Sequence, residues 1–128
     1  MKTKEIKKPI EKYFESHDTK YLAEDAVFIN METNELTIGK EAIGNMLNYI
    51  YHVAFDAYLE KTNSIVTDDK ALLEGMFTGK HIGDFAGISA TNKTVKVPLC
   101  VSYDLEDNLI KIARIYMLSN RMIDQLTN

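Results

Sequence analysis

The sequence predicts an α+β fold, with helices packed against one face of a strongly curved, mostly antiparallel sheet. Residues with helical spacing come early in the chain, and strands with alternating apolar side chains fill most of the second half. The stretch 77–97 holds three of the six glycines and joins two of these strands, so it is expected to be the loop of a hairpin, longer than most.

Helices are predicted where apolar side chains recur every three or four residues. The first carries one stripe of Ile6, Ile10, Tyr13, Phe14 and His17, and Pro9 suits its first turn. A short second helix is expected over 21–23. The best helical pattern runs over 40–54, slightly weakened by Gly44. A final helix through Gln125 is expected to be capped by Ser119.

Strands are predicted over 26–31, 36–38, 55–67, 72–80, 94–103 and 109–118. Alternation assigns side chains to faces in the last three. One face of the first of them carries Leu73, Gly75, Phe77 and Gly79, and one face of the next carries Val95, Val97, Leu99, Val101 and Tyr103. In the last strand the shared face is Ile110, Ile112, Arg114, Tyr116 and Leu118.

Length and composition narrow the classes of function. A chain of 128 residues forms one domain, 1–128, and its 45% hydrophobic content argues against disorder. The net charge of −4 and the lack of a basic cluster beyond 2–8 argue against nucleic-acid binding. Without an apolar run of about 20 residues or a signal segment, a cytoplasmic protein with no membrane partner is expected.

His81 is the sharpest candidate for acid–base chemistry. It lies between Gly79 and Gly83, where backbone or ligand can approach closely, and histidine titrates near neutral pH. The alternative is a hydrogen-bonded, partly exposed histidine that organises the hairpin loop. The three histidines lack metal-ligand spacing and Cys100 is alone, so no metal or organic cofactor is predicted.

Arg114 and Tyr116 interrupt an otherwise aliphatic strand face. An inward arginine would need a carboxylate, such as Glu74 or Glu60, or an anionic ligand, because it cannot lose its charge. The alternative is a bulge that turns it to solvent, or a structural salt bridge.

Tyrosines are candidates to line an apolar cavity, because a buried phenol needs a hydrogen-bond partner that a ligand can supply. Core packing is the alternative for each of them. Those on predicted elements are Tyr13, Tyr49, Tyr51, Tyr58, Tyr103 and Tyr116.

Several motifs resemble one family. They are Gly79-x-His81-x-Gly83-x-Phe85-x-Gly87-Ile88, then Thr91-x-Lys93-x-Val95, with 24–28, 39–43 and the C-terminal run ending in Asp124-Gln125-Leu126. In this order they are similar to the SnoaL-like polyketide cyclases of the NTF2-like superfamily. The resemblance implies a cone-shaped half-barrel closed by helices, with a pocket for a small molecule between them.

The resemblance also locates two carboxylates that this chain lacks. In the cyclases an aspartate seven positions before the terminal-helix glutamine is the acid–base residue, and here that position is Leu118. In ketosteroid isomerase, a relative within the superfamily, the base lies five positions past the aspartate that matches Asp25, and here that position is Asn30. Neither side chain is a base near neutral pH.

The expected function is binding of a small hydrophobic molecule with a carbonyl or hydroxyl group, with proton-transfer cyclisation or isomerisation as the reaction implied by the resemblance. His81 would move the proton, and Asn30, Arg114, Tyr116, Tyr13 and Tyr103 would line the pocket. The alternative is a non-catalytic ligand-binding or protein-interaction module on the same fold. A homodimer is also expected, through a sheet face bearing Leu99, Val101, Ile115 or Met117.

Overall fold

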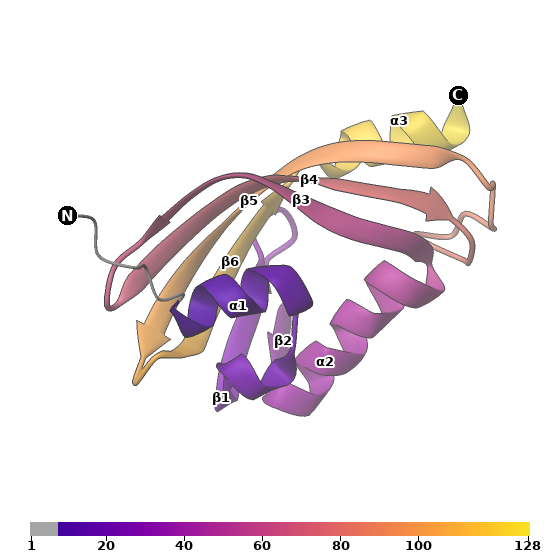
Figure 1. Ribbon diagram of the computed structural model, residues 1–128. Coiled ribbons are helices and arrows are strands. Elements are labelled where there is room, and N and C mark those ends of the chain that lie inside the picture. The colour runs from indigo at the N-terminus through magenta and orange to yellow at the C-terminus, as the bar shows by residue number, and fades with distance from the viewer. Residues whose placement is uncertain (1–7) are drawn as a thin grey trace.

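The computed structural model describes residues 8–128 and confirms the α+β fold: a curved sheet arches over helices α1 and α2 (Figure 1). The strands of the described residues are β1 (Leu22–Asn30), β2 (Leu36–Ile38), β3 (Phe55–Val66), β4 (Lys70–His81), β5 (Thr94–Glu106) and β6 (Leu109–Met117). The helices are α1 (Pro9–Ser16), η1 (Thr19–Tyr21), α2 (Lys40–Asn48), η2 (Tyr49–Val53) and α3 (Ser119–Thr127). Ile6, predicted to lie on the first helix, is outside the described residues.

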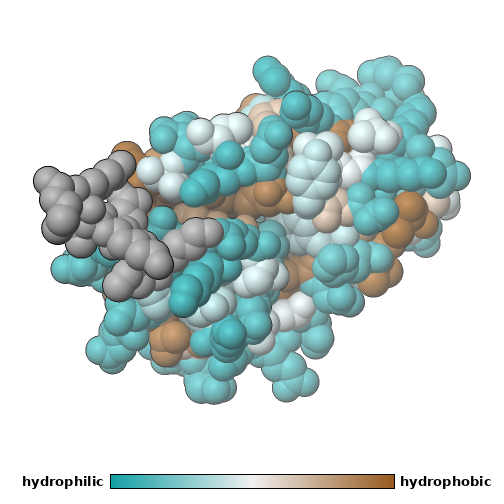
Figure 2. All heavy atoms as spheres, viewed as in Figure 1, coloured by the Kyte–Doolittle hydropathy of each residue, from teal (hydrophilic) through white to brown (hydrophobic). Residues whose placement is uncertain are grey.

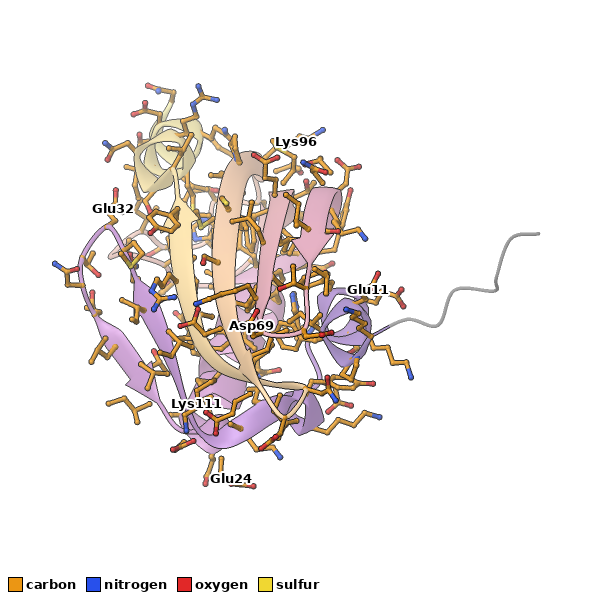
Figure 3. The ribbon with its side chains drawn as sticks, turned by 90° about the vertical axis from the view of Figure 1, so that its left-hand side faces the viewer. Glu11, Glu24, Glu32, Asp69, Lys96 and Lys111 are labelled. Atoms are coloured by element: carbon orange, nitrogen blue, oxygen red, sulfur yellow. The ribbon has the colours of Figure 1, made fainter. Side chains whose placement is uncertain are left out.

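The strands form one sheet in the order β2-β1-β6-β5-β4-β3, which can be followed across Figure 3. Strands β3 to β6 form the predicted antiparallel meander, with the long loop between β4 and β5. Strand β1 pairs parallel with β6, so the first long strand adds to the last one. The parallel pairing brings Asn30 opposite Ile115 and so places β1 beside the last strand of the chain.

Three helix boundaries differ from the prediction. The Asp18 side chain accepts a hydrogen bond from the Lys20 amide, so the short turn is 3₁₀, ends at Tyr21 and leaves 22–23 in β1. The helix predicted over 40–54 changes at Tyr49 into a π-helical segment, η2. Ser119 is the first residue of α3 rather than its cap: Leu118 occupies the cap position, without a side-chain hydrogen bond.

The predicted face of β6 is wrong beyond Ile110, because a register shift interrupts its pairing with β5. Asp104 pairs with Ile112, but the next residue of β5 pairs with Ile110, so β6 holds one extra residue. A single extra residue moves every following side chain to the opposite face. Ala113 is therefore buried, and Arg114 and Tyr116 face outward.

Two glycines beside His81 allow a close approach of backbone, not of a ligand. A Cβ on Gly79 would lie 2.4 Å from the Cβ of Ala57 in the neighbouring strand. A Cβ on Gly83 would lie 2.4 Å from the Val53 carbonyl oxygen. Both distances are shorter than any Cβ contact, so these glycines let the end of β4 pack against η2 and β3.

Two apolar clusters form the core. One packs α1 against β1, β6 and the end of β5, through residues such as Ile10, Phe14 and Ile110. The other joins η2 and the middle of the sheet to α3, through Met122 and Leu126. Helix α3 is also held by Gln125, whose side chain accepts a hydrogen bond from the Lys96 amide at 2.8 Å and donates one to its carbonyl at 2.9 Å.

Candidate functional site

A pocket of about 590 Å³ lies between the concave face of the sheet and the helices. Figure 2 shows apolar side chains, in brown, in the band between the arch of the sheet and the helices below it. The pocket walls are mostly apolar and include Phe28, Leu59, Phe77, Leu99, Val101 and Ile115. Exposed polar lining residues mark its mouth: Asn30, Glu35, Asn45 and Tyr49. A mostly apolar lining with a few polar groups is typical of small-molecule sites.

Three tyrosines and one histidine form a connected ring cluster in the pocket wall. The ring of His17 lies 5.3 Å from Tyr13 and 4.7 Å from Tyr51, between centroids. Tyr13 also contacts Tyr103 edge-on at 6.2 Å. All four side chains line the pocket, and they come from α1, its C-terminal end, η2 and β5. We call Tyr13, His17, Tyr51 and Tyr103 the polar ring cluster.

Burial keeps each member of the polar ring cluster neutral. It raises the pKa of Tyr13, Tyr51 and Tyr103, because a buried phenolate is poorly solvated. After burial, the charge of a neighbouring tyrosine, Tyr51 for Tyr13 and Tyr13 for Tyr103, raises the pKa of these two phenols further. Burial, and secondarily the charge of His52, lowers the pKa of His17 to about 4. At pH 7 the cluster therefore offers three O–H groups and one neutral imidazole.

The polar atoms of this cluster have no protein partner in the described structure. None of the side-chain hydrogen bonds within residues 8–128 uses a cluster hydroxyl or an imidazole nitrogen of His17. Buried polar groups are nearly always hydrogen-bonded to protein or to water. Because these groups line a cavity, a guest in the pocket can supply the missing partners.

The backbone at His17 is held in an uncommon conformation. His17 ends α1 with φ of 54°, in the left-handed region, and its amide donates to the Tyr13 carbonyl at 2.7 Å. Histidine tolerates this region better than most residues, yet such positions cluster at functional sites. His17 lies on the apolar stripe predicted for the first helix, but it was not among the predicted site residues. A histidine on the stripe that also carries Tyr13 is the signal that could have indicated it.

The π-helical turn η2 is a second uncommon backbone conformation in the pocket wall. The consecutive residues Tyr49, Ile50 and Tyr51 all line the pocket. Single π-helical turns are rare and frequently occur at functional sites. Tyr51 is the buried residue of this turn and packs on Phe77, with 5.3 Å between ring centroids.

Three of the predicted pocket residues line the cavity: Tyr13, Tyr103 and Asn30. Tyr13 and Tyr103 are buried within the polar ring cluster. Asn30 lies at the mouth, where its Oδ1 accepts hydrogen bonds from the amides of Glu32 and Thr33 and so shapes the turn after β1. Its carbonyl oxygen is therefore already engaged, which leaves the amide nitrogen to meet a guest.

His81 does not line the pocket. It is completely buried, stacks on Phe55 with 5.1 Å between ring centroids, and accepts a hydrogen bond at Nδ1 from the Thr91 amide at 3.1 Å. Its backbone amide and carbonyl bind the loop at Lys93 and Asn92. These contacts correspond to the loop-organising alternative, with full burial in place of partial exposure. They give His81 no contact with the cavity and so no support as its proton shuttle.

Arg114 and Tyr116 lie on the convex face, which corrects the prediction that they line the pocket. The Arg114 guanidinium forms two hydrogen bonds of 3.1 Å to the Asp104 carboxylate, and Lys70 reaches the same carboxylate at 2.6 Å. Arg114 is thus a structural salt-bridge residue whose partner is neither Glu74 nor Glu60. The side chain of Tyr116 is 48% exposed.

The apolar face predicted to form a dimer interface also has the opposite orientation. Leu99, Val101, Ile115 and Met117 line the pocket and are covered by the helices. The large apolar or aromatic side chains exposed elsewhere on the described sheet include Tyr58, Ile65 and Tyr116.

The sequence comparison places this chain in a family. The sequence model of the SnoaL-like polyketide cyclase family matches residues 12–124, and the chain belongs to that family. No curated protein sequence matches the chain.

Solved structures confirm the fold at low sequence identity. A protein from Jannaschia sp. CCS1, described as a SnoaL-like polyketide cyclase, superposes with a TM-score of 0.82 at 15% identity, over 93% of this chain and 89% of the other. A protein described as a polyketide cyclase from Silicibacter sp. gives 0.80 at 22% identity, over 94% and 93%. A protein of ketosteroid isomerase-like fold from Catenulispora acidiphila, in complex with trimethylamine, gives 0.71 at 13% identity, over 89% and 85%.

Neither position at which the family resemblance implied a carboxylate holds a base here. Leu118 is half exposed at the start of α3 and does not line the pocket. Asn30 lines the mouth, but as an amide. The described pocket lining contains one carboxylate, Glu35, and it lies at the exposed mouth.

Proposed function

We propose that this protein binds a small, uncharged, hydrophobic molecule bearing a carbonyl or hydroxyl group in the pocket, and that the reaction it supports is proton-transfer isomerisation or cyclisation. The observation that carries the proposal is an apolar cavity of about 590 Å³ whose wall holds three phenols and an imidazole without protein partners. The family relationship supports the reaction class.

The charge of the lining favours an uncharged ligand. No lysine or arginine is among the described lining residues, and His17 is neutral at pH 7. An anion would therefore be desolvated without a counter-charge, which costs several kcal/mol. The phenols can donate hydrogen bonds to a carbonyl or hydroxyl oxygen, and rings such as Phe77 offer apolar surface.

Blocking the cavity tests this proposal. Ile115 lines the pocket and its neighbour Tyr116 points out of the convex face, so Ile115→Trp and Tyr116→Trp add bulk on opposite sides of one strand. With fluorescent 2-naphthol as the probe, we expect Ile115→Trp to raise Kd at least tenfold and Tyr116→Trp to change it less than twofold. Equal effects of the two substitutions would refute binding in the pocket.

The second candidate function is a non-catalytic ligand-binding or protein-interaction module. The observation that favours it is that Leu118 and Asn30 stand at the two positions where the family resemblance implied a carboxylate. It predicts saturable binding of 2-naphthol and of 2-tetralone without any acceleration of proton exchange in the ketone.

Homodimerisation and a cytoplasmic location stay predictions. If the sheet forms the interface, its exposed side is the convex face with Tyr58 and Tyr116. No helix in the described part of the chain has the length and apolar character needed to cross a bilayer.

A further inference from the structure

We propose that His17 is the catalytic base of the pocket, and that it removes a proton from carbon next to a ketone whose oxygen is held by the hydroxyls of Tyr13 or Tyr51. This inference rests on the proposed function and deepens it, because it assigns the proton transfer to a residue that neither the sequence motifs nor the family's carboxylate positions indicated.

The position of His17 in the pocket wall supports its role as the base. His17 is the one imidazole in the described pocket lining, since His81 is sealed behind Phe55 and His52 is exposed. Its ring is held between Tyr13 at 5.3 Å and Tyr51 at 4.7 Å. A base flanked by hydrogen-bond donors is the arrangement needed to form and stabilise an enolate.

The ring nitrogens of His17 are also available to a guest. The His17 nitrogens take part in none of the hydrogen bonds of the described residues, so a ring nitrogen can accept a proton from a guest. By contrast Nδ1 of His81 is occupied by Thr91. His17 ends α1 with φ of 54°, and this left-handed backbone conformation sets the direction in which its side chain leaves the chain.

The protonation state of His17 also suits a catalytic base. Burial lowers the pKa of His17 to about 4, so the imidazole is neutral and able to accept a proton throughout the neutral range. An aspartate with a pKa of about 4.6 performs this proton transfer in ketosteroid isomerase. The titratable groups packed around His17 are Tyr13, Tyr51 and His52, with Tyr103 behind Tyr13 and Glu35 at the mouth.

The step balances without a cofactor. The C–H bond next to the carbonyl breaks, its proton moves to His17, and its electron pair forms the enolate, whose oxygen accepts a hydrogen bond from a phenol. In an isomerisation His17 returns the proton to another carbon of the conjugated system. In a ring closure the enolate carbon attacks a second carbonyl, and the new alkoxide takes the proton from His17. Both routes restore the neutral imidazole.

The test measures exchange of the acidic protons of 2-tetralone in D₂O by proton NMR. We expect the wild-type protein to accelerate exchange at least tenfold over buffer, with a rate that falls below pH 5 along an apparent pKa near 4. His17→Asn should reduce the acceleration to the buffer rate, because asparagine also tolerates the left-handed backbone but is no base. His52→Asn is the matched control at an exposed histidine and should retain exchange within twofold.

Binding of 2-tetralone, followed by displacement of 2-naphthol, separates this inference from the proposed function. Binding by both His17→Asn and wild type, with exchange lost only in the variant, supports the inference. Binding without acceleration by wild type, or equal exchange in the two proteins, overturns the inference and leaves the binding proposal intact. Failure of wild type to bind either compound overturns both.

If His17→Asn binds poorly, His17→Gly is the second variant, because glycine accepts the left-handed backbone and leaves a hole of imidazole size. Added imidazole should restore exchange in His17→Gly beyond its effect on free 2-tetralone. A lack of rescue in a variant that binds the ketone would count against His17.

Discussion

The two faces of the sheet treat polar groups in opposite ways. On the convex face, Asp104 is bound by Arg114 and Lys70. Between the neighbouring strands β1 and β6, Asp25 is bound by Lys111 at 2.6 Å, and Figure 3 places Lys111 with Glu24 at one end of the molecule. On the concave face, the phenols and His17 have no partner in the described structure.

This difference assigns the paired groups of the convex face to stability and the unpaired groups of the concave face to function. The paired groups of the convex face are already satisfied and exposed to screening by water, so each pair contributes little to stability. The unpaired groups of the concave face are buried or, for His17, half-buried, and all are uncharged, so their missing hydrogen bonds are the ones a ligand can complete. A site is thus indicated by what is left unsatisfied around a cavity, and not by where the charges are.

The largest expected contrast is between aromatic residues on the two faces. Phe77 is buried against Phe55 and Tyr51, whereas Tyr58, one strand away, is 58% exposed. Phe77→Ala should lower the free energy of unfolding by about 3–5 kcal/mol, because it enlarges the cavity and removes ring contacts. Tyr58→Ala should cost less than about 1 kcal/mol. Urea denaturation measures both, and similar losses would contradict the assignment of faces.

A second contrast appears on acidification. The folded state holds the pKa of His17 at about 4, below its ordinary value of 6.5, so the unfolded state binds more protons between these pH values. Stability that is present above pH 6.5 is lost as the pH falls toward 4, by up to about 3 kcal/mol, since each pKa unit is worth about 1.4 kcal/mol. The urea midpoints at pH 7 and pH 4.5 should differ less in His17→Asn than in wild type. Equal acid sensitivity in the two proteins would refute a His17 that stays neutral in the folded protein.

The smallest expected effects compare neighbours on β5. Asp104→Asn should lower stability by less than about 1 kcal/mol at low salt, and the loss should shrink in 1 M salt, as for any partly exposed ion pair (roughly a 3 Å Debye length). Tyr103→Phe should change stability by less than about 0.5 kcal/mol at either salt concentration, because its hydroxyl has no protein partner to lose. A large destabilisation by Tyr103→Phe would show that the hydroxyl is structurally bound.

Local patterns predicted most of the fold. Alternation correctly grouped the side chains that share a face of β4, such as Leu73 and Phe77, and of β5, such as Val95 and Val101, because both strands pair without a bulge there. It did not show which face is concave, and Val101 was instead expected on an exposed dimer face. The same reasoning failed on β6, where one extra residue reversed the face of Arg114. A bulge is set by pairing with a partner strand, so alternation within one strand does not reveal it.

The site was predicted less well than the fold. Tyr13 and Tyr103 were selected because a buried phenol needs a partner, and that reasoning holds whatever the topology. His81 was selected from its glycine neighbours, yet those glycines serve backbone packing. His17 was passed over because only the folded chain brings the end of α1 beside η2, so its contact with Tyr51 has no signature in sequence spacing.

The most direct test of the account is a crystal structure with 6-bromo-2-naphthol, located by the anomalous signal of its bromine. The account predicts one bromine peak inside the cavity and the naphthol oxygen within hydrogen-bond distance of a hydroxyl of the polar ring cluster. A bromine bound only on the convex face, or a pocket that stays empty at saturating ligand, would contradict it.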